Sequence, residues 1–407
     1  MTAPFAPSHR ILALDALRGI AVIGIVGMNV LAFALPSPAY YNPLSYGGVS
    51  PPDYWVWLGS FVFIEDKFRT LFAMLFGAGC LILIERAAAA QPHARVWRAH
   101  YARMAVLLLI GLVHATLLAS NDVLRAYALA GMALPLLAGL SARALIAVAL
   151  GLLVVHVALG LVALGAPIVA FQTGWGGHDA LLWAERQFGR DAATIAILLE
   201  QGREGLADRV ARRSLAIPAQ LITVAASLPL NLSAIALGMG LWRGGMLKGE
   251  WRTFRLQRIA GIAALVALPG LLLLALWLEE TGFPAPLVGP VALVLSAPFD
   301  MALALGYAAL AMAFLNTPTG VTRALAATGR LSLTNYVMTS VILSAIFAHW
   351  GLGLFGDVTR WQAFTLGLVP VAAMLLWSPP WVARIGQGPF ERLWRAGAAA
   401  LSYPRKA

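Results

Sequence analysis

About ten stretches of this chain are long and apolar enough to cross a lipid bilayer, which takes about 20 residues in a helix. With 60% hydrophobic and 12% charged residues, the 407-residue chain does not have the balance of a soluble domain. We therefore expect an all-α fold, a polytopic membrane helix bundle of about ten transmembrane helices in contact with the lipid bilayer. The expected spans are 15–35, 54–86, 98–119, 122–140, 142–165, 214–242, 256–279, 287–315, 325–349 and 362–381.

The basic residues between these spans fall in alternate loops. Loops 87–97, 243–255 and 316–324 carry Arg or Lys, as does the tail after 383, whereas loops 36–53 and 280–286 carry neither. The positive-inside rule then places the basic loops and both termini on the cytoplasmic side of the membrane. The formal net charge of +11 reflects this orientation, so no nucleic-acid partner is expected.

Segment 166–213 is longer than the other loops and carries charges of both signs. We expect it to form amphipathic surface helices on the periplasmic side, because long segments cross a membrane largely regardless of charge. It separates residues 1–165, with five spans and the main polar cluster, from residues 214–383, with the other five. Residues 384–407 are expected to form a cytoplasmic interfacial tail. No repeat relates the two halves, which argues against an inverted-repeat transporter.

Four charged residues interrupt the second span in the sequence Glu65-Asp66-Lys67-Phe68-Arg69. One interpretation is that the helix begins at Lys67 and that these side chains face water. The other is an ion-paired cluster that lines a cavity, because charges at membrane depth generally face a wet interior and mark a substrate path. Under the second interpretation Lys67 and Arg69, with Glu65, form the substrate-binding group, because lysine and arginine hold anionic groups.

Two further polar residues lie near the outer ends of apolar spans. His114 either bonds a backbone carbonyl or accepts a proton in a reaction, since the histidine pKa lies near working pH. Asp122 either caps the helix that follows it or orients His114 as part of a general-base pair. The spacing in the sequence does not fix the distance between them. The lone Cys80 excludes an internal disulfide, and no metal site is predicted.

Polar residues also mark the first and ninth spans. Asn29 comes eleven residues after Arg18, about three helical turns, and an amide at that depth needs a partner. Asn335 and Tyr336 follow Arg330 closely, and they either join helices by hydrogen bonds or line a pocket at the inner face. Small residues at 77–79 permit close helix packing within the chain or in a homodimer.

Four motifs resemble the YeiB family of bacterial inner-membrane proteins, a domain of unknown function numbered 418. Family proteins have been described loosely as involved in transport. The motifs occur in the family's order over nearly the whole chain: Leu14-Asp15-Ala16-Leu17-Arg18-Gly19-Ile20, Lys67-Phe68-Arg69-Thr70-Leu71-Phe72 with Leu75-Phe76-Gly77-Ala78-Gly79, Gly329-Arg330-Leu331-Ser332-Leu333-Thr334-Asn335-Tyr336, and Gly388-Pro389 with Leu393-Trp394-Arg395.

The entry Leu17-Arg18-Gly19-Ile20, with a polar residue eleven positions after the arginine, resembles a wider group of transmembrane acyltransferases. The group includes enzymes of the heparan-α-glucosaminide N-acetyltransferase type and bacterial sugar O-acyltransferases. The resemblance implies transfer of an acyl group from cytoplasmic acyl-CoA to an acceptor on the other face. The sugar enzymes carry a catalytic histidine at the position of Asn29. The heparan-type enzymes carry an asparagine there and a histidine further along, which this chain lacks.

On that basis the residues receive roles. Arg18 and Arg330 would bind acyl-CoA. Asn335 and Tyr336, which follow Arg330 in the ninth span, would line the same pocket at the inner face. Asn29 would donate to the oxyanion.

His114, oriented by Asp122, would remove the proton of a small-molecule acceptor. Lys67 and Arg69 would set the charge of the acceptor or cofactor. A transporter of a small anionic solute, with His114 as proton carrier, uses the same residues differently. A lipid-binding scaffold without turnover is the third hypothesis.

Overall fold

The computed structural model describes residues 11–90, 92–175 and 177–402, and within these ranges every regular element is helical. The all-α prediction is therefore confirmed. The elements are α1 (Leu12–Ala34), α2 (Ser37–Tyr41), α3 (Pro51–Phe63), α4 (Lys67–Ala88), α5 (His93–Leu117), α6 (Val123–Gly131), α7 (Leu134–Leu137), α8 (Ala142–Thr173), α9 (His178–Phe188), α10 (Ala192–Gly202), α11 (Leu206–Leu215), α12 (Ile217–Arg243), α13 (Thr253–Glu280), α14 (Ala285–Pro290), the π-helical turn η1 (Val291–Leu295), α15 (Ala297–Phe314), α16 (Gly320–Arg330), α17 (Ser332–Phe347), α18 (Arg360–Leu366), α19 (Leu368–Arg384) and α20 (Pro389–Ser402).

Within the described ranges, eight helical segments are long and apolar enough to cross a membrane. The pair α16 and α17 makes a ninth if it is counted as one span, and it bends by 84° between its halves. Most predicted spans correspond to these segments, so the protein is a polytopic membrane helix bundle. The predicted span 122–140 consists of two short helices, α6 and α7, instead of one continuous helix. The second span is broken between α3 and α4.

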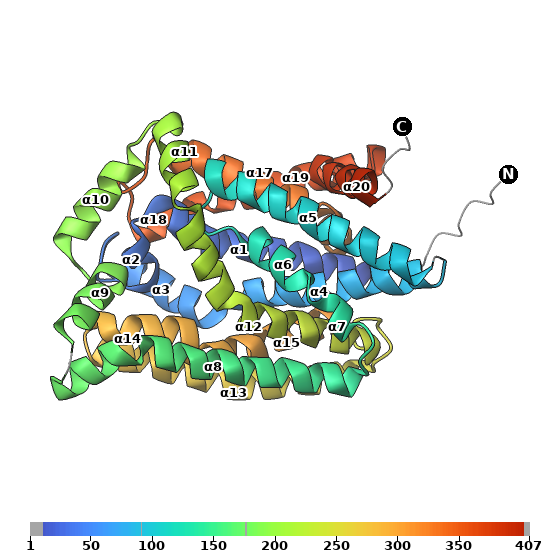
Figure 1. Ribbon diagram of the computed structural model, residues 1–407, viewed down its shortest axis with the longest axis horizontal. Helices are drawn as coiled ribbons and strands as arrows, with labels where there is room; N and C mark the ends of the chain where they lie inside the picture. The colour runs from blue at the N-terminus through green and yellow to red at the C-terminus, as the bar shows by residue number, and fades with distance from the viewer. Residues whose placement is uncertain (1–10, 91, 176, 403–407) are drawn as a thin grey trace.

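The loops predicted to lie outside meet at one end of the bundle, which we call the capped end (residues 36–50, 174–175, 177–216, 281–284 and 348–359). Asn42 donates to the carbonyl oxygens of Phe188 and Phe283 at 2.8 and 3.1 Å, and the Tyr46 hydroxyl donates to the Gly356 carbonyl at 2.8 Å. Figure 1 shows α9, α10 and α11 at this end, on the left of the view. The charge pattern thus grouped these loops correctly.

The arginine-bearing loops lie at the other end, which we call the basic end (residues 87–97 and 243–255, and α20). Arg243 Nε lies 3.3 Å from Glu85 Oε1, and the Trp394 indole donates to the Arg103 carbonyl oxygen at 2.8 Å. α20 therefore packs on α5 rather than lying apart as an independent tail (Figure 1). Residues 1–10 and 403–407, which hold the termini predicted to be cytoplasmic, lie outside the described residues.

The long helices α8 and α13 form one edge of the bundle in Figure 1 and expose most of their apolar side chains. Exposed residues include Leu150, Val154, Val162, Leu265 and Leu273. Such continuous apolar surface is stable only against lipid. By contrast, Gly77 of the small-residue stretch faces the Ile235 backbone of α12, where an added Cβ would lie 2.3 Å from its carbonyl oxygen. This glycine serves packing within the chain.

Candidate functional site

The predicted site residues fall into three groups along the bundle. Arg18, Arg330 and Asn335 lie where α1 crosses α16 and α17, toward the basic end. Residues 65–69 lie at the break between α3 and α4. His114, Asp122 and Tyr336 lie together toward the capped end. The structure therefore unites some predicted residues and separates others, and Tyr336 belongs with His114 rather than with Arg330.

Arg18 and Arg330 belong to two helices that cross closely at a pair of glycines. A Cβ on Gly19 would lie 2.1 Å from the Leu325 carbonyl oxygen, and one on Gly329 would lie 2.9 Å from the Arg18 Cβ. The backbones of α1 and α16 can approach this closely only because neither residue has a side chain. Arg18 also pairs with Asp15 at 3.1 Å. Two of the sequence motifs thus form one helix crossing with a pair of arginines.

Asn335 uses its amide to hold the bend between α16 and α17. Its Nδ2 donates to the Thr328 carbonyl oxygen at 3.0 Å and to Ser378 Oγ at 3.1 Å, and its Oδ1 accepts from the Trp377 indole at 2.9 Å. The 84° bend removes backbone hydrogen bonds, and a buried amide can replace them. The helix-joining interpretation of Asn335 therefore accounts for each of these contacts.

Glu391 of α20 caps the start of α17 from another helix. Its Oε1 accepts from the backbone N–H groups of Leu333 and Thr334 at 2.9 and 3.1 Å, and its Oε2 accepts from Thr334 Oγ1 at 2.5 Å. A carboxylate at a helix N-terminus satisfies free N–H groups and complements the helix dipole. This role was missed in the sequence, where the only signal was that Leu331, at the N-cap position, cannot cap the helix itself.

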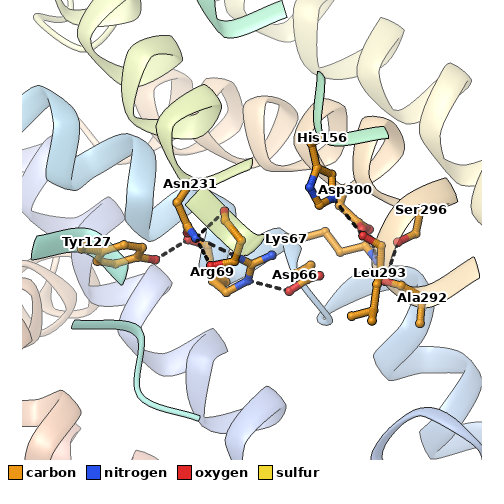
Figure 2. Close-up of polar contacts among 11 residues, drawn as sticks. Asp66, Lys67, Arg69, Tyr127, His156, Asn231, Ala292, Leu293, Ser296 and Asp300 are labelled. Carbon is orange, nitrogen blue, oxygen red and sulfur yellow. Dashed lines mark hydrogen bonds and ion pairs between the residues drawn. The ribbon is translucent and has the colours of Figure 1, made fainter. Parts of the chain in front are cut away.

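The charged cluster of the second span is ion-paired inside the protein (Figure 2). Asp66 adopts a left-handed conformation (φ 56°) in the break, and Arg69 Nε donates to its Oδ1 at 2.7 Å. Lys67 Nζ lies 2.6 Å from Asp300 Oδ1, with both side chains at most 3% exposed. Glu65 is half-buried in the break. The water-facing interpretation is thus wrong for Lys67. Glu65, which is half-buried, still has part of its surface exposed.

Asp300, the partner of Lys67, was missed in the sequence analysis. It is the lone charged residue between Glu280 and Arg323, and this was the signal that could have identified it. It follows the π-helical turn η1, where Ser296 Oγ bonds the Ala292 carbonyl at 3.0 Å. π-Helical turns often occur at functional sites, so the position is of interest beyond its charge.

His114, Asp122 and Ser340 form a connected polar group toward the capped end. His114 Nε2 lies 2.9 Å from Ser340 Oγ, and Nδ1 lies 2.9 Å from Asp122 Oδ1. The carboxylate oxygen lies off the Nδ1–H axis, so this second contact is a close electrostatic pair rather than a linear hydrogen bond. Each of these residues is at most 4% exposed. The predicted pairing of Asp122 with His114 is present.

Asp122 serves two purposes. Its Oδ2 accepts from the Arg125 backbone N–H at 3.0 Å and so caps α6, while its Oδ1 faces His114 and accepts from the Tyr336 hydroxyl at 3.2 Å. The capping interpretation is confirmed, and the same carboxylate also lies against His114. Gly111 makes the approach possible, because a Cβ there would lie 2.8 Å from Asp122 Oδ2.

Comparison with known proteins bears on the whole chain. A family model described as a protein of unknown function, DUF418, matches residues 241–400. The uncharacterised protein YeiB of Escherichia coli (strain K12) is 31% identical over 396 residues, which cover 95% of this chain and 96% of that protein. The chain belongs to the YeiB family. The uncharacterised protein YxaH of Bacillus subtilis (strain 168) is 27% identical over 98% of this chain.

The DUF418 match includes α17 with Ser340 and Tyr336, whereas His114 and Asp122 lie outside it and are covered by the full-length matches. In this YeiB-family protein the polar group therefore joins two halves of the sequence. The hydrogen bond between His114 and Ser340 spans 226 residues. It exists because the fold brings α5 and α17 into one core cluster.

Asn29 lies at the depth of this group. Ile25, Ile110 and Tyr336 belong to one core cluster, on three helices that run toward the capped end. One turn further along each helix comes a polar residue: Asn29 after Ile25, His114 after Ile110, and Ser340 after Tyr336. With 3.6 residues per turn, they continue the same helix faces at the same level. Asn29 is 9% exposed, and this spacing places it at about the depth of His114 along the bundle.

Arg125 supplies the charge that balances Asp122. Its Nε lies 3.6 Å from Asp122 Oδ2, and its other nitrogens donate to Gln220 Oε1 at 2.7 Å and to the Ser120 carbonyl at 2.6 Å. A buried charge is tolerated when it is paired and hydrogen-bonded. The sequence analysis assigned Arg125 no role, so its place in this group was missed.

Proposed function

We propose that this YeiB-family protein is a membrane-embedded acyltransferase that moves an acyl group from acyl-CoA to a small-molecule acceptor. The observation that carries the proposal is the buried pair of His114 and Asp122, 2.9 Å apart, with the far imidazole nitrogen against a hydroxyl group. A carboxylate beside Nδ1 favours the tautomer with a proton there, which leaves Nε2 free to accept one. This is the arrangement that general-base catalysis requires.

Two other predicted residues fit this chemistry. The Asn29 amide, at the depth of His114, would donate to the oxyanion of the tetrahedral intermediate. Donors held in a dry site stabilise such a charge strongly, and losing one typically lowers kcat by about 10²- to 10³-fold. Arg18 and Arg330 at the basic end would hold the phosphates of acyl-CoA, with Asn335 keeping the α16–α17 bend in place.

The orientation follows from the same assignment. We place the basic end, with both termini, on the cytoplasmic side of a bacterial inner membrane, where acyl-CoA occurs. The capped end then faces the periplasm and the acceptor. The Lys67 and Arg69 group beside the break in the second span would set the charge preference for that acceptor, with Glu65 as its acidic member.

The test is acyl transfer or acyl-CoA hydrolysis by the purified full-length protein. We expect His114→Ala to remove turnover and Asn29→Ala to lower kcat by about 10²- to 10³-fold with little change in KM. His156→Ala is the matched control, because this other membrane histidine only meets the Leu293 carbonyl oxygen, at 3.0 Å. Turnover that is equal in the His114 and His156 variants would refute the assignment.

Proton-coupled transport of a small anion is the second candidate, and a specific observation favours it. The buried pair of Lys67 and Asp300 lies beside a broken span, and buried charges at such breaks line transport paths in other membrane proteins. Arg360 at the capped end is fully buried, with Nε and Nη1 unbonded among the described residues. Accumulation of an unmodified solute in proteoliposomes under a pH gradient, without acyl transfer, would favour transport.

A further inference from the structure

We propose that Ser340 is the nucleophile of this site and carries the acyl group as an ester before the acceptor receives it. This inference rests on the proposed acyltransferase function and adds a covalent step to it. The serine lies on α17, in the part of the chain that is remote in sequence from His114 and Asp122.

The geometry is that of an activated hydroxyl. Ser340 Oγ lies 2.9 Å from His114 Nε2, and the opposite ring nitrogen lies 2.9 Å from Asp122 Oδ1. A serine becomes nucleophilic when an adjacent base can take its proton and a third group orients the base. The order of serine, histidine and aspartate recurs in hydrolases of unrelated folds, where it is recognised by geometry rather than by sequence position.

The bond that Ser340 makes differs from the usual bond of a hydroxyl in a helix. Such side chains commonly donate to the carbonyl oxygen four residues earlier. Thr116, Ser296 and Thr328 do so in this protein, at 2.8, 3.0 and 3.1 Å. Ser340 instead faces the imidazole of another helix. Ser344, also buried on the same helix one turn later, makes no such contact with a histidine and is a natural control.

The surroundings hold the imidazole in place. The ring of Tyr336 packs 5.0 Å from that of His114, and its hydroxyl donates to Asp122 Oδ1 at 3.2 Å. Arg125 compensates the charge of Asp122, so the group around Ser340 contains one cation and one anion. The charges next to His114 therefore balance. The ring of Tyr336 and the carboxylate of Asp122 both limit how the imidazole can turn.

The group lies directly below an exposed turn. Ser120 and Asn121 are exposed, whereas the next residue, Asp122, is buried. In this proposal the acceptor approaches Ser340 from the capped end, past this turn. Ser340 lies eight residues into α17, about 12 Å along the helix from its start near the basic end. An acyl-serine at mid-helix lets the donor and the acceptor arrive from opposite ends at different times.

The two steps balance without any further reactant. In the first, Ser340 Oγ attacks the thioester carbonyl carbon as His114 Nε2 takes its proton; the C–S bond then breaks, and His114 protonates the departing thiolate. In the second, the acceptor hydroxyl or amine attacks the Ser340 ester while His114 takes the acceptor proton and returns it to Ser340 Oγ. The products are the acylated acceptor and free CoA.

The experiment treats the full-length protein in detergent with a fluorophosphonate probe and, separately, with radiolabelled acetyl-CoA, followed by peptide mass spectrometry. We expect both reagents to modify the peptide that contains Ser340. Ser340→Ala should lose both modifications and at least about 10³-fold of turnover, while Ser344→Ala should retain them. Ser340→Cys should form a thioester in place of the ester. Elution of each variant at the wild-type volume in size-exclusion chromatography controls for folding.

The outcomes separate this inference from the function on which it rests. Wild-type turnover by Ser340→Ala would overturn the covalent step and leave the acyltransferase proposal standing. Turnover by the wild type without an acylated Ser340 peptide, even in rapidly quenched samples, would also overturn the covalent step but not the acyltransferase proposal. Probe labelling of Ser340 without any acyl-CoA turnover would instead support the nucleophile and refute the donor. If the wild type shows no labelling and no turnover, both the covalent step and the acyltransferase proposal are refuted.

Discussion

Replacing Asp300 by Asn should destabilise the protein by several kcal/mol, because it leaves the Lys67 ammonium buried without its partner. Lys67 Nζ lies 2.6 Å from Asp300 Oδ1, and the two side chains are 1% and 3% exposed. Removing one member of a buried ion pair typically costs about 3–5 kcal/mol. Replacing both members by apolar residues is often neutral, so the pair Lys67→Met with Asp300→Leu should cost much less than either single change.

The assay is denaturant unfolding of the detergent-solubilised protein at pH 7, followed by tryptophan fluorescence. Glu204→Gln is the control, because its partner Arg212, at 2.8 Å, is 39% exposed and such surface pairs contribute at most about 1 kcal/mol. We expect a loss of about 3–5 kcal/mol in each single variant and a much smaller loss in the double variant. Equal stability of Asp300→Asn and wild type, or a double variant as unstable as the single ones, would refute the buried pair.

Three further variants test other contacts. Glu391→Gln should lower the free energy of unfolding by about 1–2 kcal/mol, because α17 loses its charged cap, as denaturant unfolding would measure. Gly111→Ala should displace Asp122, 2.8 Å from the new methyl group, and reduce acyl-CoA turnover at least tenfold while the protein stays folded. Gly329→Ala places a methyl group 1.9 Å from a carbonyl oxygen of α1 and should lower yield and thermal stability; Gly261→Ala, with open space around it, should not.

The candidate site was only partly visible in the sequence. His114 and Asp122 stood out as polar residues on apolar spans, and both lie in one group. Ser340, within the predicted span 325–349, was assigned no role, because a buried serine in a membrane helix more often bonds its own backbone. Asp300 and Glu391 were missed because each gains its meaning from a partner on another helix.

The sequence by itself determined which segments are helical and apolar, and which loops share an end of the bundle. Both properties come from local composition: hydropathy over about 20 residues and the count of Arg and Lys between spans. Tertiary structure alone decided that Lys67 faces Asp300 and that His114 faces Ser340. Those contacts depend on the depth and rotation of each helix against its neighbours, which follow from packing at residues such as Gly19 and Gly329 rather than from any local pattern.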